Sequence, residues 1–474
     1  MSEVAPSTDA DPGTTARRSS SGYANYVFWV MFSINFLNYL DRNVLAGAAT
    51  TVAHELGFGV DGIGYISSAF LVVYTLGTVP LGIWADRAQR KNVVAFCIAV
   101  WSVATALTAL ATNFTTLFLS RMVLGIGEAG YFPAGTALMS DYFNREKRSR
   151  IMSWWSCGQL VGILFGFAIG GELAGLYIGS WRLAFIFTGI PGLILALLAW
   201  KLREPRRNQA DEETFSLASN EVGTRDNVEE VPHVVVPRNV LSQFGTLLRI
   251  KTLVVLIAMQ VFAFFVLSVN LVYLPTYLQQ KDSFGFSSAK AGLFSGAIIV
   301  LAGMAGTILG GYMADWLNRR HQGARVLVCG IGFLLGAPAF AVSVTSHNLF
   351  VFTLFFIITA LLLTVYSGPS TAATQDVVPS VLRASSVAIS LLIAHLLGDA
   401  FAPSLVGFLA KSFDPTHGAH FTNNVAGHDL STALLFTCTP ALVIAGLIGI
   451  FGARWMKADV AAAEQADKLA REQR

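Results

Sequence analysis

Long apolar segments recur along the whole chain, and each is long enough to cross a lipid bilayer. A membrane-spanning helix needs about 20 predominantly apolar residues. We place twelve such segments in two sets of six: 25–52, 62–85, 92–112, 114–140, 149–175 and 181–201, then 252–279, 287–314, 325–344, 347–374, 383–410 and 428–455. Helices of this length satisfy their own backbone hydrogen bonds inside a bilayer. The pattern therefore predicts an all-α integral membrane protein with twelve transmembrane helices.

The composition agrees with this prediction. Only 13% of the 474 residues are charged, against roughly 25% in soluble domains. The four cysteines each stand alone in an apolar segment, so no disulfide framework and no zinc site is expected. We expect no metal and no cofactor.

The basic residues lie mainly in the connections that follow even-numbered segments. They are Arg87, Arg90 and Lys91, then Arg145, Lys147, Arg148 and Arg150, then Arg319, Arg320 and Arg325. An excess of Lys and Arg marks the cytoplasmic side of a membrane. We therefore expect a multi-pass protein of the plasma (bacterial inner) membrane with both termini in the cytoplasm. The basic residues report orientation, and no nucleic-acid partner is expected.

Polar stretches divide the chain. Residues 1–22 are expected to be a disordered cytoplasmic tail, 23–202 an N-terminal six-helix bundle and 247–457 a C-terminal one, with a second cytoplasmic tail at 458–474. Residues 203–246 are rich in charged residues, Pro and Asn, which favours a cytoplasmic linker over a packed core. A small folded insert around "VPHVVVP" is the alternative.

An internal repeat supports two related halves. Gly82 to Lys91 follows the second segment, and Gly311 to Arg320 follows the eighth with the same order of Gly, Asp and two basic residues. Asp141 to Arg148 is matched by Asp376 to Arg383 after the tenth segment. Parallel halves related by an axis along the membrane normal are one plan for a transporter.

These motifs resemble known signatures. The Gly82–Lys91 loop, the "RMVLGIGEAG" stretch at 121–130 and the glycines Gly158, Gly162, Gly166 and Gly170 are similar to motifs of the major facilitator superfamily. Within it, "NYLDR" at 38–42, "GIGEAGY" at 125–131 and "AHLLGDAFAPSLVGFLA" at 394–410 resemble the spinster family of lysolipid and sphingosine-phosphate-type transporters. The first two of these stretches also resemble sugar-acid symporters, so it is the third that distinguishes the spinster family from them.

The resemblance implies two pseudo-symmetric six-helix bundles that work by alternating access. It also implies an amphipathic substrate, lysophospholipid-like or sphingoid-like, and coupling to protons. We expect a monomer whose partners are this small-molecule substrate, protons and membrane lipid.

Four charged residues lie inside apolar segments. Asp41 and Arg42 are adjacent, so their side chains point about 100° apart and each needs a partner on another helix. Arg121 and Glu128 are seven residues apart and share one helical face. Charges within a membrane mark functional sites by default, so we predict a buried network that couples protons or gates substrate, in which Arg121 tunes Glu128. The alternative is a charge network whose only role is to hold the helices together.

Gly125-x-Gly127-x-x-Gly130 also matches a dinucleotide-binding pattern. That pattern requires a preceding strand, whereas here it falls inside a membrane-spanning segment. Close helix packing through small residues is the better reading.

The repeated loops predict a conformational latch that holds the bundles together in the outward-facing state. Its residues are Gly82, Asp86, Arg87, Arg90, Lys91, Arg148, Gly311, Asp315, Arg319, Arg320 and Arg383. A cluster that only sets membrane topology is the alternative.

Aromatic residues and one polar pair are expected to line the substrate cavity. They are Tyr39, Phe70, Tyr74, Tyr131, Phe132 and Tyr366, with His395 and Asp399 four residues apart on one helix face. A structural His–Asp pair is an equally good reading. A cavity with many aromatic and few charged residues suits an amphipathic ligand.

We therefore predict a secondary active transporter. A proton-coupled symporter of sugar acids or other organic anions, or a drug efflux carrier, is the alternative within the same class. An enzyme is not expected, because Ser, His and Asp do not cluster and no ATP-binding loop is present. The repeated loops favour a rocking carrier over a passive channel.

Overall fold

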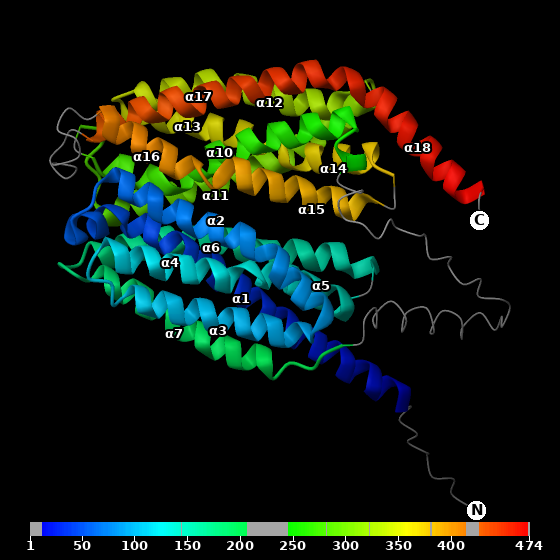
Figure 1. Cartoon of the computed structure of the whole chain (residues 1–474), viewed down its shortest axis with the longest axis horizontal. Helices are drawn as coiled ribbons and strands as arrows, with labels where there is room; N and C mark the ends of the chain where they lie inside the picture. Colours follow the sequence, from blue (N-terminus) through cyan, green and yellow to red (C-terminus); the bar gives the residue numbers. More distant parts are fainter. Residues whose placement is uncertain are drawn as a thin grey trace, which may run out of the picture.

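The protein is described by a computed structural model that covers residues 12–143, 145–205, 245–280, 282–321, 323–379, 382–413 and 426–472. The described part is helical and contains no strand. Most of the expected linker, 206–244, and residues 1–11 of the expected N-terminal tail lie outside it. The helices form two bundles side by side, one blue to green and one green to red in Figure 1.

The N-terminal bundle contains α1 (Pro12–Leu56), α2 (Val60–Arg87), α3 (Arg90–Thr108), α4 (Phe114–Ala129), α5 (Tyr131–Tyr142), α6 (Arg145–Ala174) and α7 (Trp181–Trp200). The C-terminal bundle contains α10 (Lys251–Gln279), α11 (Ser288–Asn318), α12 (Ala324–Thr345), α13 (Leu349–Thr364), α14 (Ser367–Val377), α15 (Arg383–Ala394), the π-helical turn η2 (His395–Asp399), α16 (Ala402–Phe413) and α17 (Ala426–Gly452). A short 3-10 turn, η3 (Ala453–Trp455), and α18 (Met456–Glu472) follow.

Ten of the described helical stretches are long and apolar enough to cross a membrane. The twelve-helix architecture is completed by α1 and by the pair α4 and α5. These two crossings are also the ones that carry the buried charges Asp41, Arg121 and Glu128 and the partly exposed Arg42. The fold class predicted from the sequence is thus confirmed.

Three predicted segments are interrupted rather than continuous. Segment 114–140 is split into α4 and α5 at Gly130, and segment 347–374 is split into α13 and α14. At Gly130 a Cβ atom would lie 2.8 Å from Cys97 Sγ and 2.9 Å from Leu81 Cβ, so glycine permits the close approach to α2 and α3. Segment 383–410 contains the π turn η2.

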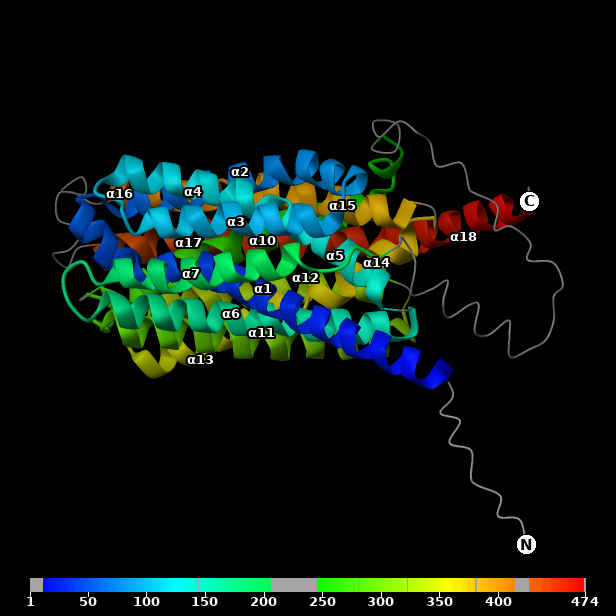
Figure 2. The same ribbon diagram turned by 90° about the horizontal axis from the view of Figure 1, so that it is seen from below.

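The helix α1 begins at Pro12, within the stretch 1–22 for which the sequence predicts a disordered tail. Proline is well suited to the first position of a helix, because that residue needs no backbone N–H donor. The start of α1 and the end of α18 lie at the same end of the molecule (Figure 2).

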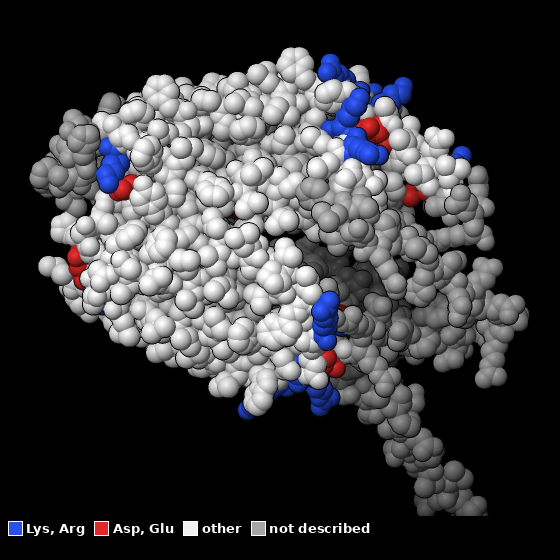
Figure 3. All heavy atoms as spheres, viewed as in Figure 1, with Lys and Arg blue, Asp and Glu red and all other residues white. Residues whose placement is uncertain are grey.

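The two bundles are joined at the opposite end, where α2 lies against α16 and α6 against α11. Tyr273 on α10 is fully buried there, and its hydroxyl donates to Val60 O at 3.2 Å or to Pro403 O at 2.8 Å, one in each bundle. Toward the end that carries α5, α14 and α15, the surface is hollowed between the bundles, and Lys and Arg gather around that end (Figure 3).

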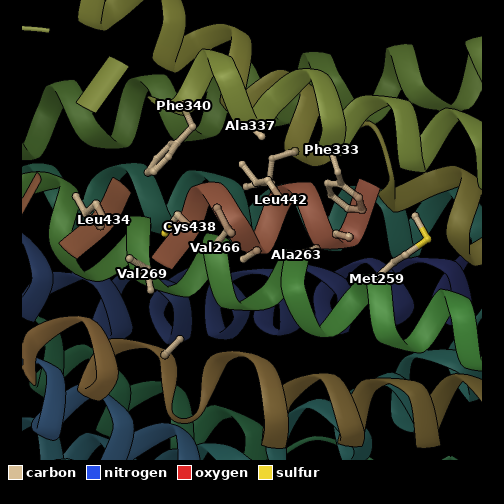
Figure 4. Packing of buried hydrophobic residues seen from close by; sticks show 14 of the residues in the cluster. Met259, Ala263, Val266, Val269, Phe333, Ala337, Phe340, Leu434, Cys438 and Leu442 are labelled. Atoms are coloured by element: carbon tan, nitrogen blue, oxygen red, sulfur yellow. The ribbon is translucent and has the colours of Figure 1, made fainter. Parts of the chain in front are cut away.

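The largest hydrophobic core fills the C-terminal bundle. Phe333 and Phe340 of α12 face Leu442 of α17 (Figure 4). The buried residues of α10 in the same core include Met259, Ala263, Val266 and Val269. The helices α12 and α17 approach closely, since a Cβ atom on Gly449 would lie 2.8 Å from Gly330 Cα. Small residues at such crossings let helix backbones come together in membranes.

Candidate functional site

A row of glycines on α6 orients α1. A Cβ atom on Gly166 would lie 2.6 Å from Leu40 O and 2.9 Å from Asn43 Cβ. Leu40 and Asn43 therefore face α6. The residues between them, Asp41 and Arg42, point in other directions because successive side chains turn about 100° around a helix.

Arg42 forms an ion pair with Glu128 across the gap between α1 and α4. Its Nε donates to Glu128 Oε2. The Glu128 side chain is fully buried, whereas 18% of the Arg42 side chain is exposed. The carboxylate of the pair is thus buried within the N-terminal bundle, and its guanidinium is partly exposed.

Three aromatic rings surround the Arg42 guanidinium. Its carbon lies 4.4 Å from the ring centroid of Tyr74, 5.1 Å from Tyr39 and 5.4 Å from Phe70. Each ring face attracts a cation, by about 0.5–2 kcal/mol depending on desolvation. These ring contacts hold the guanidinium in place beside Glu128.

Tyr74 also connects this cage to the other bundle. Its ring meets His395 of η2 edge-on, with centroids 6.0 Å apart, and Phe264 lies 5.0 Å from the same imidazole. His395 Nδ1 lies 2.8 Å from Asp399 Oδ2. Five of the expected cavity residues, Tyr39, Phe70, Tyr74, His395 and Asp399, are therefore brought together where the two bundles face each other.

Tyr131, predicted to line the cavity, lies in the core instead. It is 1% exposed, packs against Trp101 with centroids 5.4 Å apart, and donates to Met31 O at 3.3 Å. The break at Gly130 makes Tyr131 the first residue of α5, and this turns its ring into the bundle. Phe132 stacks on Trp155 with centroids 5.5 Å apart, and Tyr366 packs on Phe333.

Asp41 and Arg121 lie deeper in the N-terminal bundle. Asp41 is fully buried and accepts a hydrogen bond from Thr105 at 3.4 Å. Arg121 is 3% exposed, and its guanidinium lies 4.8 Å from the ring centroid of Phe185. Arg121 is close enough to Asp41 and Glu128 to attract both carboxyl groups. The structure brings the four predicted charges together, but the ion pair on Glu128 is formed by Arg42, not by Arg121.

Many polar atoms in this region have no protein partner. Among the described residues, Asn38 Nδ2, Asp41 Oδ1, Trp101 Nε1, Ser102 Oγ, Arg121 Nε, Arg121 Nη2 and Glu128 Oε1 are buried without a hydrogen bond. Each unsatisfied buried group costs about 1–3 kcal/mol.

The predicted latch residues whose ion pairs the structure describes pair within their own bundles. Arg90 is buried and pairs with Asp141 and Glu204. Asp315 is 70% exposed on its side chain and lies 3.3 Å from Arg325, which also pairs with Asp376.

The sequence repeat therefore misassigns one partner. It matches Arg90 to Arg319, but Arg325 takes the place of Arg90 in the C-terminal half, at the start of α12. Arg319 and Arg320 are exposed, and Arg320 stacks on Trp316 at 4.9 Å. The repeat also matches Asp141 to Asp376 in sequence. Asp141 forms an ion pair with Arg90, and Asp376 forms one with Arg325, so this match was the signal that could have identified Arg325.

The remaining latch residues form no ion pair to the other bundle in the described part of the chain. Arg87 is exposed, Lys91 N donates to Glu204 at 3.0 Å, and Arg383 Nε donates to Gln375 O at 3.0 Å. Gly82 and Gly311 have open space where a Cβ atom would be. The side chains of Asp86 and Arg148 lie outside the described residues.

Two helical bundles that meet at one end and part at the other, with a charged site in the N-terminal bundle that faces the C-terminal one, are typical of membrane transporters. Comparison with known proteins supports this class. The sequence pattern of the Major Facilitator Superfamily matches residues 31–403, and the chain belongs to this superfamily. Within it, the chain resembles the spinster family.

Two relatives show the range of this similarity. "Protein spinster" of Drosophila melanogaster is 26% identical over 424 residues, covering 88% of this chain and 67% of the relative. "Probable L-galactonate transporter" of Escherichia coli is 26% identical over 444 residues, covering 90% of this chain and 92% of the relative.

Two solved structures of a bacterial homolog of the human lysosomal transporter spinster share the fold. The inward-facing, occupied form has a TM-score of 0.74 at 22% identity and covers 92% of this chain and 97% of its own. The inward-facing, unoccupied form has a TM-score of 0.75 at 24% identity, with coverage of 94% and 98%.

Proposed function

We propose that this transporter carries an anionic amphipathic molecule, such as a lysophospholipid or a sphingoid phosphate, together with protons. The observation that carries the proposal is the position of Arg42. This side chain is the partly open member of the buried charge network, and it lies in an aromatic cage that faces the other bundle.

The cage fits both ends of such a substrate. Arginine N–H groups bind carboxylate and phosphate oxygens through charge-assisted hydrogen bonds. The rings of Tyr74, Phe70 and Phe264 around Arg42 and His395 offer apolar surface to a hydrocarbon chain. Pockets that combine many apolar groups with few polar ones bind amphipathic ligands in this way.

The ion pair of Arg42 with Glu128 suggests how proton binding is coupled to substrate binding. Asp41, Arg42, Arg121 and Glu128 carry two formal charges of each sign, so their network is neutral when all four are ionised. An anion that binds Arg42 competes with Glu128 for the guanidinium. Glu128 would then be a buried carboxylate without its partner, which is costly, and uptake of one proton restores neutrality. Substrate and proton are thereby bound together.

The arrangement of the bundles supports a cytoplasm-facing state. Basic residues gather at the end where the bundles part, which is also the end that carries the start of α1 and the end of α18 (Figures 2 and 3). By the positive-inside rule this end is cytoplasmic. We propose a monomer in the bacterial inner membrane with both termini in the cytoplasm and the linker 203–246 on the same side.

In this proposal the latch stabilises the outward-facing state of the transport cycle. When the bundles close at the cytoplasmic end, the loops at Gly82–Lys91 and Gly311–Arg320 meet helices of the opposite half. In the present conformation a Cβ atom on Gly82 or on Gly311 would meet nothing within 4 Å.

A sugar acid is the second candidate substrate. The 26% identity to a protein named as a probable L-galactonate transporter, with 92% of that protein covered, favours it. Both candidates present an anion to Arg42, and they differ in whether a hydrocarbon chain occupies the aromatic surface.

Thermal unfolding in detergent separates the two candidates. A ligand that binds only the folded state raises the melting temperature in proportion to the logarithm of its concentration. We expect a concentration-dependent rise with a single-chain lysolipid and none with a hexonate or hexuronate. The variant Arg42→Gln controls for a general detergent effect, because it should lose the rise. A rise with the sugar acid alone would overturn the lipid assignment.

A further inference from the structure

The atoms without partners in the N-terminal bundle point to a ligand that the transport site does not account for. They come from three helices: Asn38 and Asp41 on α1, Trp101 and Ser102 on α3, and Arg121 and Glu128 on α4. All belong to residues that are buried, and both N–H donors and oxygen acceptors are present.

Arg121 on α4 is close enough to attract both Asp41 and Glu128, so the two carboxyl groups lie around the same guanidinium. Asn38 and Asp41 are one turn apart on α1, and Ser102 is one turn from Thr105, which donates to Asp41 at 3.4 Å. Trp101 lies against Gly127, since a Cβ atom there would be 2.9 Å from Trp101 Cα. Gly127 is adjacent to Glu128, so the backbone of α3 at Trp101 lies beside the part of α4 that carries this carboxyl group.

Asp41 is fully buried, whereas Arg42 is partly exposed. Arg42, with its ion pair to Glu128 and the rings of Tyr39, Phe70 and Tyr74 around it, lies on the side of the network that faces the other bundle. Phe185 covers Arg121 on the side of α7. A substrate held by Arg42 therefore has no direct access to Asp41.

We infer that the N-terminal bundle holds a cluster of ordered water molecules between Asp41 and Glu128, separate from the substrate cavity. Buried water typically makes about three hydrogen bonds to protein groups that would otherwise lack them. The donors of Asn38, Trp101 and Arg121 and the acceptors Asp41 Oδ1 and Glu128 Oε1 supply such a lining.

The cluster gives the proton a path. Glu128 releases its proton to an adjacent water oxygen, each water passes one of its own protons onward, and the last proton binds the carboxylate of Asp41. One O–H bond forms for each that breaks, and no electrons are exchanged. This use of the water rests on the proposed proton coupling, whereas the presence of the water does not.

Radiolytic hydroxyl-radical labelling of the wild-type protein tests for the water directly. Trp101 and Trp155 form a matched pair, because both are buried, but Trp155 Nε1 donates to Met31 O at 3.0 Å while Trp101 Nε1 has no protein partner. After rapid mixing into H₂¹⁸O, we expect oxidation of Trp101 at least five-fold above that of Trp155, with ¹⁶O retained from slowly exchanging water. Equal oxidation of the two residues would overturn the inference.

A second measurement tests the path. Thr105→Val removes a hydroxyl that donates to Asp41, and it should slow uptake driven by a pH gradient several-fold while leaving substrate exchange intact. Thr108→Val is the control, because Thr108 lies on the same helix and donates to Ala104 O at 2.9 Å or Ser120 Oγ at 3.0 Å, away from the cluster. If uptake driven by the gradient is equal in the two variants, the path is wrong even where the labelling result stands.

Discussion

The Nζ atom of Lys411 on α16 lies 2.7 Å from Oδ2 of Asp61 on α2, and this ion pair joins the two bundles at the end where they meet. Beside it, the backbone N–H of Ser404 donates to Ser68 Oγ at 3.1 Å across the same boundary. These contacts exist only while this end is closed. They therefore favour the conformation that is open at the opposite end.

Breaking the pair should shift the conformational balance. The Lys411 side chain is 42% exposed, and partly exposed ion pairs contribute about 0.2–1 kcal/mol. We expect Lys411→Ala to raise the outward-open population by up to about five-fold. Distances between spin labels on the outer ends of α2 and α16 measure this change.

Lys290→Ala is the control, because Lys290 contacts Phe286 of its own bundle at 3.9 Å. The swapped variant Asp61→Lys with Lys411→Asp should restore the original distribution. A distribution that does not change in Lys411→Ala would show that the pair is not part of the outer closure.

Gly82 tests the cytoplasmic latch. A Cβ atom there meets nothing within 4 Å in the present conformation, so Gly82→Leu should fold normally. If the bundles close over this position when the transporter faces outward, the leucine holds them apart and transport falls at least ten-fold. Uptake into proteoliposomes measures it, with the 48% exposed Ile83 changed to Leu as the control. Normal uptake by Gly82→Leu would exclude a close latch at this position.

Tyr74 should set the affinity for the anionic substrate. It lies closest to Arg42 of the three rings and also contacts His395 of the other bundle. Tyr74→Leu removes an interaction of about 0.5–2 kcal/mol, which corresponds to a loss of affinity of about 2- to 30-fold. Tyr74→Phe keeps the ring face and should bind nearly as wild type. Equal losses in both variants would assign the effect to the hydroxyl instead.

Glu55 should make part of the stability dependent on pH. It lies at the end of α1, outside the membrane-spanning segment, and pairs with Arg182 while accepting from Trp181 Nε1 at 2.7 Å. Burial acts to raise the pKa of Glu55, but the hydrogen bonds from Arg182 and Trp181 outweigh it and hold the pKa below its ordinary value.

A carboxyl group with a lowered folded-state pKa stabilises the protein fully above its unfolded pKa, about 4.3 for Glu, and less as the pH falls through the folded value. Thermal unfolding should therefore show a smaller loss of stability below this pH in Glu55→Gln than in the wild type. The exposed Glu172 provides the control variant Glu172→Gln. Parallel curves for Glu55→Gln and the wild type would contradict this role.

The architecture was predictable because bilayer thickness sets the length of each apolar segment, and the repeated loops at Gly82 and Gly311 reveal two halves. The interruptions were not predictable. Gly130 and the π turn at His395 depend on tight contacts between helices that are distant in sequence, such as that of Gly130 with Cys97.

The four residues of the charge network could likewise be predicted from the sequence, but which of them form an ion pair could not. Arg121 shares a helix face with Glu128, which suggested that Arg121 tunes this carboxyl group. The rotation of α1, set by the contact of Gly166 with Leu40, directs Arg42 to Glu128 instead. Such rotations are determined by packing between helices, and the spacing of charges along one helix does not report them.

The proposed coupling of protons to substrate is tested most directly by Glu128→Gln. Glutamine has nearly the shape of protonated glutamate but cannot titrate, so the network keeps the charge of its protonated state. In proteoliposomes we expect this variant to retain substrate binding and exchange between equal substrate pools, and to lose uptake driven by a pH gradient. Glu172→Gln should behave as the wild type. If Glu128→Gln transports at the normal rate with its pH dependence intact, Glu128 is structural and the coupling lies elsewhere.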